Sequence, residues 1–124
     1  MKLAIIGSRG FNDYNFLKEN VSEFLERNSL SCTHIISGGA KGADTLASQY
    51  ATEHQLEMVI FKPDWKQFGK RAGFIRNTTI IENADVVIAF WDGISSGTKD
   101  SIAKATAFNK RIKIFSYENS NCRK

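Results

Sequence analysis

Five short apolar runs, separated by stretches with helical spacing, constrain the fold of this chain more than any other feature. The runs occupy residues 2–8, 33–38, 56–62, 84–91 and 111–117 and are rich in Ile, Val and Phe. Their hydrophobicity is mostly continuous, which is typical of parallel strands buried on both faces. Strands of this kind that alternate with helices favour right-handed βαβ units around one parallel sheet.

The stretches between the runs predict four helices, at residues 12–28, 42–54, 72–84 and 98–110, and the first two have a clear apolar face. We therefore expect an α/β protein with a single-domain, Rossmann-like, three-layer α/β/α architecture. Its parallel five-stranded sheet should have the strand order 3-2-1-4-5.

Length and composition agree with one globular domain. The chain has 124 residues, 42% hydrophobic and 24% charged, and we assign residues 1–118 to the domain and residues 119–124 to a polar tail. No apolar run approaches the roughly 18 residues of a membrane span, and the first run ends in glycine and serine rather than continuing as a signal peptide. These features predict a cytoplasmic protein, and its net charge of +4 favours anionic partners.

Neither the cysteines nor the histidines have the spacing of a metal site. Cys32 and Cys122 are isolated, and His34 and His54 have no cysteine or acid at ligand spacing. We predict no metal and no disulfide framework.

Ligands of Rossmann-like sheets bind beyond the carboxyl ends of the strands, at the switch in strand order, which here lies between the first and fourth strands. Four polar segments follow strands and should face that crevice. In "GSRG", Gly7 permits a tight turn, Ser8 offers a hydroxyl and Arg9 a guanidinium suited to phosphate. An ordinary strand-ending turn is the alternative.

The second segment, "SGGAKGAD", leads from a strand into a helix. Its candidate residues are Ser37, Gly38, Gly39, Gly42 and Asp44. Glycine lets backbone N–H groups approach an anion, and the helix N-terminus adds a partial positive charge. The pattern is neither a Walker A loop nor the dinucleotide fingerprint. A plain glycine-rich turn, with Asp44 as a first-turn helix acid, is the alternative.

The third segment, "GKRAGFIRN", contributes Arg71, Arg76 and Asn77 from the start of a helix, with ion pairing to nearby acids or solvation as the alternative. The fourth, "WDGISSGTKD", offers Ser96, Gly97 and Thr98 for phosphate binding before a helix. Helix capping is the alternative there.

Taken together and in this order, the four segments resemble the SLOG superfamily, specifically its YspA-like, YpsA-related branch. The superfamily also contains the lonely-guy phosphoribohydrolases and the DNA-processing protein A family. The resemblance extends from Gly7 to about Ala107 and implies a Rossmann-like fold with a site for a nucleotide or nucleotide-derived ligand. It implies that the four segments form the walls of that site, with Ser96, Gly97 and Thr98 as its phosphate-binding turn.

One position departs from the lonely-guy pattern, a Pro-Gly-Gly-x-Gly-Thr-x-x-Glu loop whose glutamate takes part in cleaving a base from a ribose phosphate. Aligned through Gly97 and Thr98, this chain has Ser101 in place of that glutamate. Asp100 is one residue early, which turns it about 100° away on a helix. Asp44 and Asp92 are then the candidate catalytic carboxylates, and whether the protein is an enzyme stays open.

The leading hypothesis is a module that senses or sequesters a nucleotide or an ADP-ribose-like derivative. One alternative is a hydrolase of N-glycosidic or phosphoester bonds. The third possibility is a binder of single-stranded nucleic acid, through the basic cluster of Lys70, Arg71 and Arg76 and the aromatic residues Trp65, Phe68 and Phe74. We also expect a homo-oligomer, a dimer or tetramer, because an aromatic surface that includes Phe11, Tyr14, Trp65 and Phe68 would otherwise be exposed.

Overall fold

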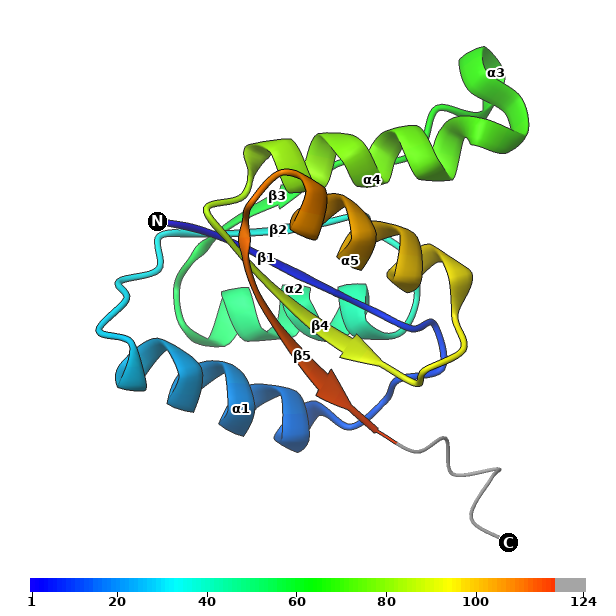
Figure 1. Cartoon of the computed structure of the whole chain (residues 1–124). Helices are drawn as coiled ribbons and strands as arrows, with labels where there is room; N and C mark the ends of the chain where they lie inside the picture. The colour runs from blue at the N-terminus through cyan, green and yellow to red at the C-terminus, as the bar shows by residue number, and fades with distance from the viewer. Residues whose placement is uncertain (118–124) are drawn as a thin grey trace, which may run out of the picture.

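The predicted strands all form, and they pair in parallel in one sheet of order β3-β2-β1-β4-β5, as expected (Figure 1). The structure is a computed structural model that describes residues 1–117, so the expected tail and Cys122 lie outside the described residues. The strands are β1 (Lys2–Gly7), β2 (His34–Ser37), β3 (Glu57–Ile60), β4 (Val86–Trp91) and β5 (Arg111–Ser116).

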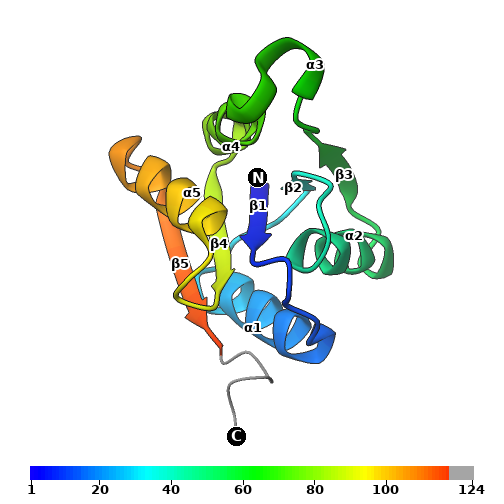
Figure 2. The same cartoon turned by 90° about the vertical axis from the view of Figure 1, so that its right-hand side faces the viewer.

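Helices cover both faces of this sheet, which completes the three-layer architecture (Figure 2). The four predicted helices are α1 (Tyr14–Arg27), α2 (Ala43–Glu53), α4 (Ala72–Asn83) and α5 (Ser96–Ala107). A short α3 (Trp65–Phe68) and a 3₁₀ turn, η1 (Gly69–Arg71), were not predicted, because four and three residues are too few to show a periodicity.

The central strands explain the continuous hydrophobic runs. Along β1, Leu3 and Ile5 belong to the core beneath α1 and α2, whereas Ala4 and Ile6 belong to the core beneath α4 and α5. Alternate residues of a strand point to opposite faces, so a strand covered on both sides has no polar positions.

The expectation that every strand is buried on both faces is wrong for β3 and β5. These strands form the two edges of the sheet, and their residues are partly or fully exposed, including Ile60 and Ile114. An edge strand has a neighbour on one side only, and the helices cover the centre of the sheet better than its borders.

The expected aromatic surface is also smaller than predicted. Phe11 is only 2% exposed, and its ring stacks on Phe90 at 5.0 Å between centroids. Tyr14 and Phe68 are partly buried, whereas Trp65 is largely exposed. The predicted oligomer therefore loses most of the surface on which the prediction was based. Within residues 1–117, no helix has both the length and the apolar character needed to cross a bilayer.

Candidate functional site

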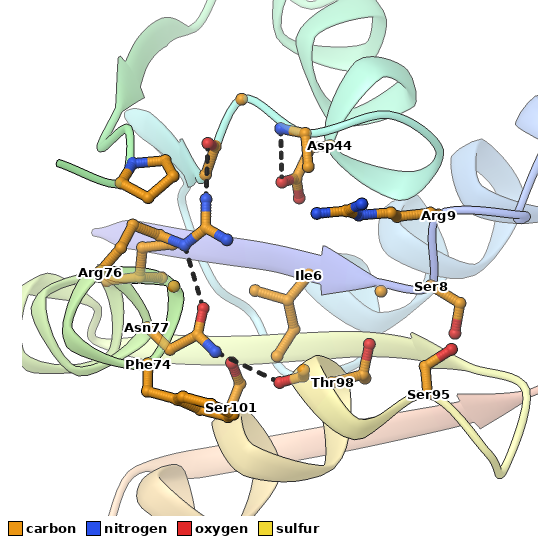
Figure 3. A pocket seen from close by; sticks show the side chains of 18 of the residues that line it. Ile6, Ser8, Arg9, Asp44, Phe74, Arg76, Asn77, Ser95, Thr98 and Ser101 are labelled. Carbon is orange, nitrogen blue, oxygen red and sulfur yellow. Dashed lines mark hydrogen bonds between the residues drawn. The ribbon is translucent and has the colours of Figure 1, made fainter. Parts of the chain in front are cut away.

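A crevice of about 870 Å³ lies beyond the carboxyl ends of the strands, at the predicted switch in strand order. The loops after β1, β2 and β3 line it, together with the N-terminal turns of α2, α4 and α5 (Figure 3). The following predicted site residues line the crevice: Gly7, Ser8, Arg9, Gly38, Gly39, Asp44, Arg76, Asn77, Ser96, Gly97 and Thr98. Ser37, Gly42, Arg71 and Asp92 are not among the lining residues.

Asp44 is the carboxylate of this crevice. Gly42 caps α2 and Asp44 lies in its first turn, 9% exposed, where Oδ2 accepts a hydrogen bond of 3.0 Å from the backbone N–H of Ala40. Burial raises the pKa of Asp44 above its usual value, and the Ala40 N–H and the charges of Arg76 and Arg9 oppose this only in part. The buried carboxyl group can therefore be protonated at a higher pH than an exposed aspartate.

Two guanidinium groups face Asp44 from opposite sides of the crevice (Figure 3). Arg9 extends from the loop after β1 and is exposed, whereas Arg76 comes from α4 and is half-buried. Burial lowers the pKa of Arg76, and the negative charge of Asp44 partly restores it. With one carboxylate between two arginines, this part of the crevice has an excess of positive charge, which attracts an anion.

Arg76 is held by its neighbours rather than left free. Nη1 donates to the carbonyl oxygen of Gly38 at 2.7 Å, and Nε donates to Oδ1 of Asn77 at 3.0 Å. A Cβ at position 38 would occupy the place of the Arg76 guanidinium, so glycine is required there for this close approach. The side chain is therefore oriented before any ligand arrives, with N–H donors of Nη2 still available.

Asn77 connects this arginine to the N-terminus of α5. It is buried, and its Nδ2 donates to the carbonyl oxygen of Gly97 at 3.3 Å and to Oδ2 of Asp100 at 3.2 Å. One side chain thus fixes Arg76 and the turn around Gly97 relative to each other.

The first turn of α5 lines the crevice with Ser96, Gly97 and Thr98. The helix begins at Ser96, and the N–H of Lys99 is the first that bonds back, to the carbonyl oxygen of Ser95 at 3.1 Å. Helix geometry leaves the earlier amides, those of Ser96, Gly97 and Thr98, without intrahelical acceptors. Such a helix end is a suitable site for a phosphate.

Ser101 and Asp100 occupy the places that the sequence comparison with the lonely-guy loop predicts. Ser101 is buried and lines the crevice with a hydroxyl group. Asp100 is not a lining residue, and its Oδ2 lies 2.7 Å from Nζ of Lys104 and accepts from Asn77. The carboxylate of Asp100 is therefore paired with Lys104 of α5 and Asn77 of α4.

Asp92 is also engaged by its own loop. Its Oδ1 accepts from the N–H groups of Ile94 and Ser95 at 2.9 and 2.8 Å, and Oδ2 accepts from the Ser95 hydroxyl at 2.9 Å. Partial burial acts to raise the pKa of Asp92, but these hydrogen bonds outweigh it and hold the pKa below its usual value. Asp92 therefore stabilises the turn before α5 through these hydrogen bonds. Unlike Asp44, it is not a lining residue of the crevice.

The other predicted residues outside the lining have definite places. Ser37 is fully buried at the end of β2, and Gly42 shapes the turn into α2 with a φ of +79°. Arg71 is exposed on η1, whereas Arg76 lines the crevice. The two arginines are five residues apart, about 140° around a helix, so they do not share a face.

From the connection between β3 and α4, the sequence predicts only Arg71 in the nucleotide site, and it suggests Trp65 and Phe74 for nucleic-acid binding alone. Lys62, Pro63, Trp65 and Lys70 from this connection, and Phe74 from the first turn of α4, line the crevice. The available signal was the basic, aromatic stretch "KPDWKQFGKRAGF" itself, because the end of β3 lies at the same edge of the sheet as the glycine loops. Within residues 1–117, no group of three or more His, Cys, Asp or Glu side chains is placed to hold a metal ion.

Comparison with known proteins gives one family match and one curated relative. Residues 1–68 match the family described as "YspA, cpYpsA-related SLOG family". The chain is 32% identical over 110 residues to the Gene 61 protein of Mycobacterium phage D29, covering 84% of this chain and 87% of that protein.

Two solved structures share the fold. DNA processing protein A from Helicobacter pylori, whose structure concerns its binding of single-stranded DNA, superposes with a TM-score of 0.69 and 22% identity over 98% of this chain and 70% of its own. The X-ray structure of the structural genomics target TM1055 gives a TM-score of 0.62 and 22% identity, covering 90% of this chain and 71% of that one. These similarities confirm the Rossmann-like architecture.

Proposed function

The chain belongs to the YspA, cpYpsA-related SLOG family, and from this membership and the geometry of the crevice we propose that it binds a nucleotide or a nucleotide-derived ligand, such as an ADP-ribose-like molecule. By binding it, the protein would sense or sequester that ligand. The observation that carries the proposal is the placement of Arg9, Arg76 and the N-terminus of α5 around one crevice with a single carboxylate, Asp44.

Each part of this arrangement suits one part of a nucleotide. The amides of the first turn of α5 and the guanidinium groups suit phosphate oxygens, because charge-assisted hydrogen bonds to oriented donors are strong and directional. The buried Asp44 carboxyl group suits a ribose hydroxyl, which can donate to a carboxylate. A crevice of about 870 Å³ has the volume of an ordinary small-molecule site.

Calorimetric titration with AMP and ADP-ribose tests the proposal, and Arg76→Gln is its sharpest variant. Loss of a charged hydrogen bond costs about 1.5–3 kcal/mol, so the affinity should fall about 10- to 100-fold. Arg9→Gln should weaken binding in the same direction, and because Arg9 is exposed this change leaves the core intact.

Arg71→Gln is the matched comparison, since Arg71 is an exposed arginine five positions before Arg76 and is not a lining residue. Its affinity should stay within about twofold of the unaltered protein, as is usual for a surface change away from the ligand. Absence of binding at high micromolar concentration, or equal effects of Arg71→Gln and Arg76→Gln, would contradict the proposal.

A hydrolytic activity is the second candidate, and the raised pKa of the buried Asp44 favours it. A carboxyl group in a ligand-sized crevice with such a pKa suits a general acid or base. Incubation of the protein with AMP and with NAD, followed by chromatography for released base and nucleoside and an assay for released phosphate, would detect it. Turnover that disappears in Asp44→Asn would establish this function, and the absence of all these products would exclude it for these substrates.

Single-stranded nucleic acid is the third candidate, because DNA processing protein A has the same fold and binds single-stranded DNA. A mobility-shift assay with an oligonucleotide across a range of salt concentrations distinguishes this function, since phosphate-backbone binding weakens steeply with salt. An oligonucleotide that binds more tightly than AMP, with such a salt dependence, would favour the nucleic acid over the free nucleotide.

A further inference from the structure

The two ends of the crevice differ, because Phe74 lies at only one of them, on the same side as Arg76 and Asn77 (Figure 3). Ser8, Arg9 and Ser95 lie at one end, and Phe74 lies at the other (Figure 3). Trp65, which also lines the crevice, is 56% exposed, and Phe74 is 48% exposed. Two such aromatic side chains beside a charged crevice leave a large apolar area in water, and burying it against a flat ligand would be favourable.

Trp65 is positioned over the backbone of the first turn of α4. Its Cη2 atom is 3.8 Å from the point where a Cβ of Gly73 would be, so the missing side chain leaves space beside the indole. The indole belongs to α3, which projects past the end of α4 and contacts only that helix and η1 to any extent (Figures 1 and 2). Trp65 therefore lies beside α4, and more than half of its surface is exposed to solvent.

Phe74 is fixed from the side of α5. Nζ of Lys104 donates to the backbone carbonyl of Phe74 at 2.7 Å and lies 5.7 Å from the centroid of its ring. Oδ2 of Asp100 accepts from the same ammonium group at 2.7 Å. The ring is held in a defined place by a cation–π contact, while about half of the residue's surface remains accessible.

We infer that Trp65 and Phe74 form a stacking subsite for a nucleobase, at the opposite end of the crevice from the N-terminus of α5 that would receive the phosphate. The inference rests on the proposed function and adds which part of the ligand binds at which end. A nucleobase has two π faces and stacks on an aromatic side chain whatever its sequence context. The base can come from a free nucleotide or from a nucleic-acid chain.

The pair AMP and ribose 5-phosphate tests the subsite, because a hydroxyl group replaces the base of AMP in ribose 5-phosphate. Calorimetry should show tighter binding of AMP than of ribose 5-phosphate to the unaltered protein. Trp65→Ala should weaken AMP about tenfold, near the lower end of the loss on removing a stacking aromatic, and should change ribose 5-phosphate less than twofold. Phe74→Ala should act in the same direction.

Trp65→Phe is the conservative variant and Phe108→Ala is the control. Trp65→Phe keeps a stacking ring, so AMP affinity should return to within about threefold of the original. Quenching of tryptophan fluorescence by AMP should nevertheless be lost, because Trp91, the remaining tryptophan, is not a lining residue. Phe108 is 42% exposed at the far end of α5, and Phe108→Ala should leave both affinities unchanged.

The outcomes separate this inference from the proposed function. If neither these probes nor ADP-ribose binds, the proposed function and the subsite both fail. If AMP binds no more tightly than ribose 5-phosphate, or if Trp65→Ala weakens both equally, the subsite is wrong and the phosphate site stands. A change in sedimentation on Trp65→Ala without a change in the ratio of the two affinities would assign Trp65 to self-association and overturn the inference.

A short single-stranded oligonucleotide identifies the source of the base. If Trp65→Ala weakens AMP and the oligonucleotide alike and the unaltered protein prefers AMP, the subsite takes the base of a free nucleotide. If the oligonucleotide binds more tightly than AMP and loses at least as much affinity on Trp65→Ala, the same stacking subsite takes a base from a chain.

Discussion

The loops that follow β2 and β4 contain the same kinds of residue but use their acids in opposite ways. Each leads from a buried strand through glycine and small polar residues into a helix, and each carries an aspartate. Asp44 lies in the crevice with its pKa raised by burial, whereas Asp92 accepts three hydrogen bonds from its own loop and has its pKa lowered. The difference shows that burial and the number of local hydrogen-bond donors, not the residue type, decide whether an acid is available to a ligand.

The backbones of the two loops differ for a steric reason. Gly42, at φ +79°, brings α2 against the loop after β1, and a Cβ there would be 2.5 Å from the carbonyl oxygen of Arg9. Gly97 lies within the first turn of α5 with open space around it. One glycine therefore permits a close approach, and the other leaves room beside the helix N-terminus.

The largest effect on stability is expected from replacing Gly42, and replacing Gly97 should have little effect. Gly42→Ala should lower the free energy of unfolding by about 3 kcal/mol, because alanine at this positive φ is strained and its Cβ collides with backbone atoms. Gly97→Ala should change it by less than about 1 kcal/mol, since alanine is the better helix former. Urea denaturation of both variants measures this, and equal losses would show that the two turns are built alike.

Removal of the hydrogen bonds of Asp92 should have an intermediate effect. Asp92→Ala leaves the N–H of Ser95, the N-cap residue of α5, without its acceptor, and we expect a loss of about 1 kcal/mol in the free energy of unfolding at pH 7.

The pH dependence of this loss in unfolding free energy shows whether the charge of Asp92 causes it. Because the folded-state pKa of Asp92 is lowered, its stabilisation is present above the unfolded pKa, near 4, and is lost as the pH falls through the folded pKa. The difference between the unaltered protein and Asp92→Ala should therefore shrink in acid. A difference that stays constant from pH 7 down to acid would contradict the assignment.

Asp44→Asn should have the smallest effect on stability, and of opposite sign. The folded-state pKa of Asp44 is raised, so its charge costs stability above that pKa, and stability falls as the pH rises from the unfolded to the folded pKa. Asparagine keeps an acceptor for the Ala40 N–H without the charge. The variant should equal the unaltered protein in acid and be as stable or slightly more stable at pH 7.

Thermal unfolding across pH 3–7 measures this effect of Asp44→Asn. A variant that is clearly less stable at pH 7 would show that the attraction of Arg76 and Arg9 outweighs the burial of the carboxylate. The charge of Asp44 would then stabilise the fold, as the charge of Asp92 does.

Much of the site could be predicted because parallel sheets bring the ends of their strands to one edge. Gly7, Ser8 and Arg9 follow β1, and Gly38 and Gly39 follow β2, so their presence at the crevice follows from strand assignment alone. Arg71 and Arg76 could not be told apart in this way, because the η1 turn, which the sequence did not predict, sets the direction of Arg71. The position of Trp65 depends on the path of the β3 to α4 connection, whose short elements have no periodicity, and the position of Phe74 depends on the packing of α4 against α5.

The sequence by itself predicted the sheet, its order and the edge at which a ligand would bind, because five apolar runs that alternate with helical stretches are typical of a parallel sheet. It also carried the segments that mark the family. The tertiary structure decided which groups each charged side chain contacts. Arg76 donates to the Gly38 carbonyl, and Asp44 lies between two arginines. Asp92 accepts hydrogen bonds from its own loop. Such pairings depend on distances between residues far apart in the chain, and no local pattern encodes them.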